Sequence, residues 1–222
     1  AQLSFSKSLS PSTAQRQQQY AQGISSFAVS NLHTCVILLN GEVVCWGSSA
    51  LGMLGRSGLN SIGSEIPVTD TLTANFGTPA ILLAIGHYAT CILTASNSVR
   101  CAGRNSLGEC GYPNVPSVGF DSQTEAAYLG DVQLGVRMVS LAGTDQVRCG
   151  VTEHMDLMCF GSLKYGLNGH GQHVGDDEHP ADVGVVDMQG TKFRKVSLGS
   201  AMAAAVTSSG SLMVWGLNRN GR

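Results

Sequence analysis

Short apolar stretches separated by tight-turn residues recur along most of this chain. In the first instance, residues 35–39 and 42–46 are largely apolar and flank Asn40-Gly41, a dipeptide typical of two-stranded hairpins. The equivalent dipeptides further along are Ser96-Asn97, His154-Met155 and Ser209-Gly210. Asn takes the left-handed turn conformation almost as Gly does, but Met does not. We therefore expect hairpins in all four places and a different turn geometry at His154-Met155.

A further apolar stretch precedes each hairpin after the first. These stretches are residues 81–84, 138–141 and 193–196, and each follows a long, glycine-containing loop. Strands of this length with turns between them predict an all-β fold of antiparallel strands.

The hairpins belong to a repeat that is visible when the chain is aligned with itself. Marker glycines end the second strand of each hairpin, 56, 58 and 55 residues apart: Gly47, Gly103, Gly161 and Gly216. Five positions further on come Gly52, Gly108, Gly166 and Gly221, and three beyond those come Gly55, Gly111 and Gly169. Glycines at fixed offsets indicate backbone positions that need positive φ or close approach, once per unit.

Six of the seven cysteines fall in pairs ten residues apart: Cys35/Cys45, Cys91/Cys101 and Cys149/Cys159. In a hairpin with an odd-length loop the two members of a pair lie directly opposite, within reach of a disulfide. The fourth unit has Ala204 and Val214 at these positions, so both cysteines are absent together. Buried reduced thiols and metal ligation are the alternatives, and cross-strand disulfides are our prediction. Three disulfides favour an oxidising compartment, extracellular or in the secretory lumen.

The seventh cysteine, Cys110, stands where the first unit has Leu54 and the third has Asn168. We interpret it as a small apolar filler; the alternative is an intermolecular partner.

The amino-acid composition argues against nucleic acid and anionic membranes as partners. The chain is 43% hydrophobic and 13% charged, with 28 glycines and a net charge of -2. It therefore lacks the basic field that nucleic acid or an anionic membrane would require. The longest apolar run is too short to span a bilayer.

The glycine motifs resemble those of the regulator of chromosome condensation repeat family. The residues that carry the resemblance are Cys45-Trp46-Gly47 with Leu51-Gly52-Met53-Leu54-Gly55, Gly103 to Gly108, and Trp215-Gly216 to Gly221. The similarity extends over residues 24–222. It implies a β-propeller with four-stranded blades, usually seven of them. The cysteine pairs look like those of secreted members rather than nuclear ones.

The Ser- and Gln-rich composition of the first 22 residues and the repeat that follows them predict a division of the chain. We expect an extended N-terminal arm or linker at residues 1–22 and a partial β-propeller at 23–222. Its repeats would be residues 24–79, 80–136, 137–192 and 193–222, or three and a half to four blades. Seven blades of this period need roughly 390 residues. We therefore expect a portion of a longer polypeptide, or a ring that another chain or further copies complete.

The polar residues offer few candidate sites. A loop of the third repeat holds a weak candidate set for a divalent cation, and a solvated loop is the interpretation we favour: His173, Asp176, Asp177 and His179. No Ser-His-Asp arrangement or phosphate-binding loop is recognisable, so we expect no catalytic residue and no cofactor. Trp46, Phe160 and Trp215 share one repeat position, which favours packing between blades over ligand binding.

These observations predict a non-enzymatic extracellular structural or protein-interaction module whose partners are other proteins. The alternatives are a guanine-nucleotide exchange factor for a small GTPase, in the nucleus or cytoplasm, and a propeller-based inhibitor or hydrolase. The cysteine pairs count against the exchange factor, because those compartments keep thiols reduced.

Overall fold

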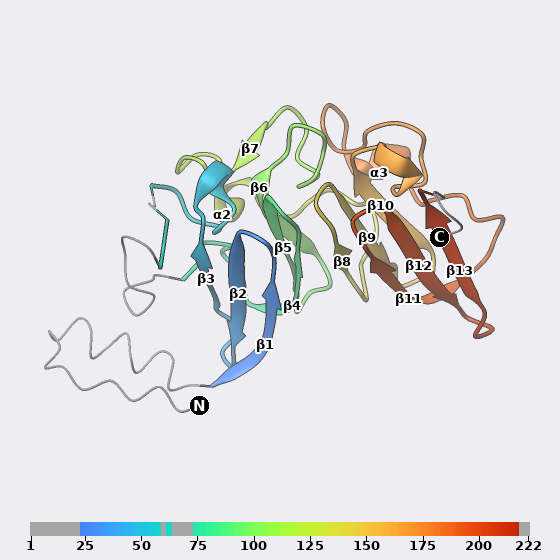
Figure 1. Ribbon diagram of the computed structural model, residues 1–222, viewed down its shortest axis with the longest axis horizontal. Helices are drawn as coiled ribbons and strands as arrows, with labels where there is room; N and C mark the ends of the chain where they lie inside the picture. The colour runs from blue at the N-terminus through green and yellow to red at the C-terminus, as the bar shows by residue number, and fades with distance from the viewer. Residues whose placement is uncertain (1–22, 59–60, 64–72, 218–222) are drawn as a thin grey trace, which may run out of the picture.

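The computed structural model describes residues 23–58, 61–63 and 73–217, so the predicted arm at 1–22 and the glycine at position 221 lie outside the described residues. Its strands form four antiparallel sheets. Figure 1 shows the sheets side by side along an open arc, with the first and fourth at opposite ends. The fold is all-β, as the sequence predicts.

Three strands per sheet follow the chain in a simple meander. The first sheet has β1 (Ile24–Val29), β2 (His33–Leu38) and β3 (Val43–Gly47). The second has β4 (Ala80–Ile85), β5 (Ala89–Thr94), β6 (Val99–Arg104) and the short β7 (Ser117–Val118). The third has β8 (Ala142–Gly143), β9 (Val147–Val151) and β10 (Leu157–Gly161). The fourth has β11 (Phe193–Leu198), β12 (Met202–Thr207) and β13 (Leu212–Gly216).

A fourth strand is regular only in the second sheet. In the first and third sheets its place is taken by isolated bridges, Gly47 with Ile62 and Gly161 with Val174. Short helical turns interrupt the loops: η1 (Ala50–Gly52), α2 (Ala126–Leu129), η3 (Lys164–Gly166) and α3 (Pro180–Val183).

All four hairpin turns have one geometry, and our expectation for the third was wrong. The residue with positive φ is Gly41, Asn97, Met155 or Gly210. Met155, at φ 62°, donates its N–H to the carbonyl of Thr152, as its counterparts do in their turns. The Thr152 hydroxyl also accepts hydrogen bonds from the N–H groups of His154 and Asp156. These bonds hold Met155 in a conformation that its side chain disfavours.

The stretch at 138–141 does not form the strand expected of it. The N–H groups of Val139 and Ser140 both donate to the carbonyl of Val151. This shared acceptor interrupts the regular hydrogen-bond pattern between the two strands. Only a bridge from Met138 to Thr152 and the two-residue β8 remain of that strand.

Two of the repeated glycines show why no larger residue fits. A Cβ on Gly103 would lie 2.2 Å from the carbonyl oxygen of Tyr88, and its φ is +121°. A Cβ on Gly108 would lie 2.1 Å from the carbonyl oxygen of Val174 in the third repeat. The first glycine allows close contact within a blade, and the second allows contact with the next blade.

Disulfides join all three predicted pairs, Cys35–Cys45, Cys91–Cys101 and Cys149–Cys159, with Cα atoms 4.0 to 4.1 Å apart. They lie within the interfaces between sheets. Cys35 Sγ is 3.8 Å from the hydroxyl of Thr90 in the second sheet, and the third disulfide packs in one apolar cluster with Ala203 and Ala205 of the fourth sheet. The equivalent pair of the fourth sheet, Ala204 and Val214, lies on the opposite face from Ala203 and Ala205, at the end of the arc.

Candidate functional site

A pocket of about 240 Å³ opens where the second, third and fourth sheets meet. Its walls come from loops and strand ends: His87 and Tyr88 between β4 and β5, residues 144–147 between β8 and β9, the turn around η3, Arg104 at the end of β6, and Ser200. Three repeats thus contribute to one opening. Loops carried on a rigid scaffold are the usual place for binding residues.

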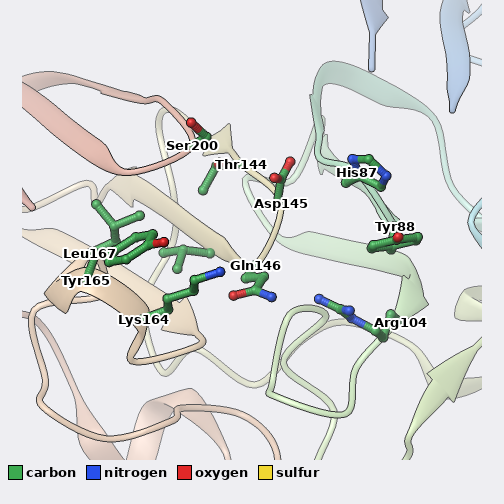
Figure 2. Close-up of a pocket in the computed structure, with 11 residues that line it drawn as sticks. His87, Tyr88, Arg104, Thr144, Asp145, Gln146, Lys164, Tyr165, Leu167 and Ser200 are labelled. Carbon is green, nitrogen blue, oxygen red and sulfur yellow. The ribbon is translucent and has the colours of Figure 1, made fainter. Parts of the chain in front are cut away.

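Two cations flank this pocket, each against an aromatic ring. The guanidinium of Arg104 lies 4.8 Å from the ring centre of Tyr88, and the ammonium of Lys164 lies 5.1 Å from that of Tyr165. Figure 2 shows both side chains reaching toward Gln146 from opposite sides. Each aromatic ring attracts its cation electrostatically, which favours a position of the charged group at the wall of the pocket.

Arg104 is only partly neutralised. Its Nε donates to the buried carboxylate of Glu109 at 2.5 Å, and Glu109 also accepts from the N–H of Leu107. The Nη2 of Arg104 is buried and has no hydrogen-bond partner. The protein encloses this nitrogen, so leaving it without an acceptor has a cost in free energy.

A second arginine, Arg148, lies fully buried beside the same loops. Its Nη1 donates to the carbonyls of Thr144 and Val147, and its Nη2 donates to the carbonyl of Ala89 in the second sheet. Burial lowers its pKa, and the nearby carboxylates of Glu109 and Asp145 partly offset that effect. Arg148 therefore fixes the loop that carries Asp145 and Gln146 against the neighbouring blade.

A similar polar link joins the first and second sheets. The hydroxyl of Thr90 donates to the carbonyl of Met53 and lies 2.7 Å from Nε2 of His33. Burial, with the charge of Arg148, lowers the pKa of His33 to about 4, so this histidine is neutral in the folded protein. Thr90 and Arg148 occupy the same position in consecutive repeats.

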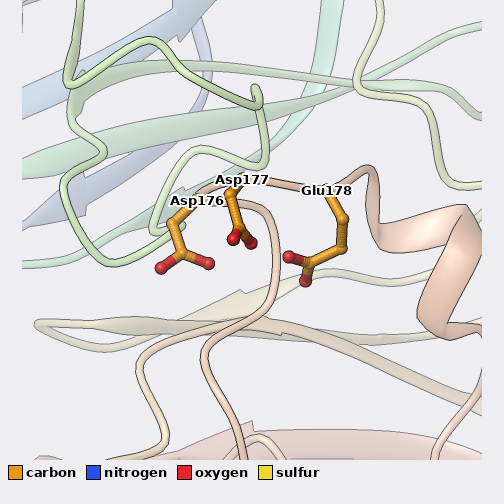
Figure 3. Close-up of side chains that lie close together, drawn as sticks. All are labelled: Asp176, Asp177 and Glu178. Atoms are coloured by element: carbon orange, nitrogen blue, oxygen red, sulfur yellow. The ribbon is translucent and has the colours of Figure 1, made fainter.

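The loop proposed as a cation site brings together a different set of residues. The carboxylates of Asp176, Asp177 and Glu178 lie within 4.8 Å of one another, while neither His173 nor His179 belongs to this group (Figure 3). Burial and the neighbouring acids raise the pKa of Glu178. Exposed acids of this kind are common in solvated loops, so the group by itself assigns no ligand.

Other residues singled out from the sequence have structural places. Cys110 is buried and free, and its thiol donates to the carbonyl of Arg104. Burial raises the pKa of that thiol well above its usual range. Phe160 is buried, and the indole N–H of Trp215 donates to the carbonyl of Leu167 in the third repeat. Both aromatic side chains therefore pack between blades.

Sequence reasoning missed the pocket residues Arg104 and Lys164. Arg104 ends β6 in the second repeat and Lys164 lies in η3 of the third, and no local motif connects them. Only the packing of these two blades brings them to one opening with Asp145, and that packing has no signal within a single repeat.

In the part of the chain that the structure describes, every helix is too short to cross a membrane.

Comparison with known proteins agrees with this geometry. Residues 24–52 and 81–109 match the model of the Regulator of chromosome condensation (RCC1) repeat. Human E3 ubiquitin-protein ligase HERC2 is 24% identical over 211 residues, which are 92% of this chain and 4% of that protein. The chain spans less than half the length of the curated relatives that it matches.

Two solved structures share the fold. Prp20p from Saccharomyces cerevisiae, studied with its binding to Gsp1p and histones, superposes with a TM-score of 0.68 at 20% identity, over 88% of this chain and 45% of that one. The entire ectodomain of the Physcomitrella patens receptor kinase CR4 gives 0.53 at 15% identity, over 89% and 42%. The four sheets are consecutive blades of a β-propeller. The repeats of this chain are similar to regulator of chromosome condensation repeats.

Proposed function

We propose that this chain is a non-enzymatic protein-interaction module that works outside the cell or in the secretory lumen. The observation that carries the proposal is the set of three disulfides, placed at one register position in three consecutive blades. Such bonds persist in oxidising compartments and are rare in the cytosol and nucleus.

The likeness to solved propellers supports both parts of the proposal. One neighbour is a receptor-kinase ectodomain, and another is a protein studied for its binding to other proteins. A propeller presents its loops on a rigid ring, so binding by loops from several blades suits this architecture.

Both ends of the arc expose apolar sheet faces that a further blade would cover. In β1, Ala28 pairs with Cys35 toward the second sheet, so Phe27 faces the other way and is 70% exposed. At the far end, Leu212 is 65% exposed. We infer that further blades, from the same polypeptide or from another chain, cover these faces, because exposed sheet faces of this kind promote association.

Thiol counting by intact mass tests the compartment. The protein, isolated without reductant, is denatured and alkylated before and after reduction. The proposal expects one alkylated cysteine before reduction, Cys110, and seven after it. Seven alkylated cysteines before reduction would overturn the extracellular assignment.

A guanine-nucleotide exchange factor is the second candidate, because the repeats resemble those of the regulator of chromosome condensation family. Release of a fluorescent guanine nucleotide from small GTPases separates the two. The interaction module leaves the release rate unchanged, whereas an exchange factor raises it many-fold.

A further inference from the structure

We propose that the pocket between the second, third and fourth blades receives one acidic side chain from an extended segment of a partner protein. This inference rests on the proposed interaction function and names the chemistry of the partner at one site. Its basis is the pair of cations at the pocket, each against an aromatic ring, and the acid on the opposite wall.

The volume of the pocket favours a single side chain over a cofactor-sized ligand. Sites for cofactors and drug-sized ligands usually have volumes of roughly 300–1,000 Å³. At about 240 Å³, this pocket has room for a side chain and the backbone next to it. A single carboxylate on a peptide is therefore a better fit than a nucleotide or another large organic ligand.

The charges select an anion. Lys164 forms no ion pair within the described residues, and Arg104 uses only its Nε on Glu109. A carboxylate between the two side chains would accept from the Lys164 ammonium and from Nη1 of the Arg104 guanidinium. Hydrogen bonds of this kind between charged groups are about twice as strong as neutral ones.

Asp145 argues against a polyanion. It forms no ion pair in the described part of the chain, and its carboxylate points away from Lys164 and Arg104, toward the other side of the opening (Figure 2). A nucleic acid or a sulfated glycan would bring several charges close to this acid. A peptide would bring one charge to the cations and its backbone N–H groups to Asp145. Asp145 therefore favours an acidic peptide over a nucleic acid or a sulfated glycan.

Three probes test the assignment by nuclear magnetic resonance titration of the intact protein. The first is a blocked pentapeptide with a central glutamate between alanines, the second has glutamine in its place, and the third is sodium sulfate. We expect saturable shifts at the amides of Gln146, Lys164 and Tyr165 with the glutamate peptide. Glutamine should weaken binding about tenfold, since it removes one charge-assisted interaction. Equal binding of the two peptides, or sulfate binding as tightly as the glutamate peptide, would overturn the proposal.

Two variants with one control locate the site. Lys164→Gln should weaken the glutamate peptide about fivefold or more, while Lys195→Gln, at an exposed position of β11, should leave it unchanged. Asp145→Asn should raise the affinity for sulfate. Arg104 is left intact, because its loss would strand the buried carboxylate of Glu109. A Lys164→Gln protein that binds the peptide normally contradicts the assignment.

The failure of this inference is distinguishable from that of the interaction function. If the disulfides are present and a partner protein binds equally to wild type and Lys164→Gln, the module stands and the pocket assignment falls. If all the thiols are free, the compartment assignment falls whatever the peptides do.

Discussion

The guanidinium of Arg148 in the third blade donates a 3.0 Å hydrogen bond from Nη2 to the carbonyl of Ala89 in the second. The same side chain also donates to two carbonyls of its own blade. A fully buried cation thus joins two blades through backbone acceptors rather than through a carboxylate.

Replacing Arg148 with Lys should therefore be costly although it keeps the charge. One ammonium cannot reproduce the planar fork that reaches acceptors in both blades. We expect a loss of about 2–4 kcal/mol in the free energy of unfolding, measured by urea titration. Arg194→Lys, at an exposed position of β11, is the matched control and should change stability by less than about 0.5 kcal/mol. Equal urea midpoints for the two variants would show that the guanidinium geometry of Arg148 contributes nothing to the free energy of unfolding.

His33 should make stability depend on pH. Its pKa is about 4 in the folded protein and 6.5 for an unperturbed histidine, so between these pH values the unfolded chain binds a proton that the folded protein does not. Stability therefore falls as pH falls through this window, by about 2 kcal/mol between pH 7 and pH 5. Urea unfolding at both pH values measures the change. The His33→Gln variant should lack this component; the same pH dependence in both proteins would contradict the assignment.

The disulfide positions can be exchanged between repeats. The double variant Cys91→Ala/Cys101→Val gives the second blade the residues that the fourth has naturally, and should lose about 3 kcal/mol of stability for a ten-residue loop. The reverse pair, Ala204→Cys/Val214→Cys, occupies the same directly opposed register. It should form a fourth disulfide, visible as protection of two further cysteines from alkylation. Free thiols at both new positions would show that the register alone is insufficient.

The two tryptophans allow a matched test of one hydrogen bond. Trp215 donates its indole N–H to the carbonyl of Leu167 at 3.1 Å, whereas the indole of Trp46 has no such partner among the described residues. Trp215→Phe should therefore cost about 1 kcal/mol more than Trp46→Phe in thermal or urea unfolding. Equal losses would mean that only the change in packing matters.

The sequence was informative wherever the physical cause is local. The opposed cysteines Cys35 and Cys45 follow from hairpin register, and the marker glycine Gly103 follows from a backbone contact that repeats in every unit. Met155 shows the limit of such reasoning. Side-chain preference argued against positive φ, but the hydrogen bonds of Thr152 impose it.

Two features were not predictable in this way. The third repeat loses most of its first strand at residues 138–141, because Val139 and Ser140 both donate to the carbonyl of Val151, and the apolar pattern does not reveal this irregular pairing. The pocket unites Arg104 of the second repeat with Asp145 and Lys164 of the third. It requires the relative positions of neighbouring blades, which a single repeat does not encode.

Three of the hydrogen bonds between blades run in the same direction along the chain. Thr90 donates to Met53, Arg148 to Ala89 and Trp215 to Leu167, so each time a later side chain donates to an earlier main-chain carbonyl. Synthesis on the ribosome also proceeds from the N-terminus, and the domains of larger proteins generally fold in that order. Every blade that emerges therefore meets an acceptor already held in place by its predecessor. The arc can grow by addition at its C-terminal end, without waiting for the whole chain to be released.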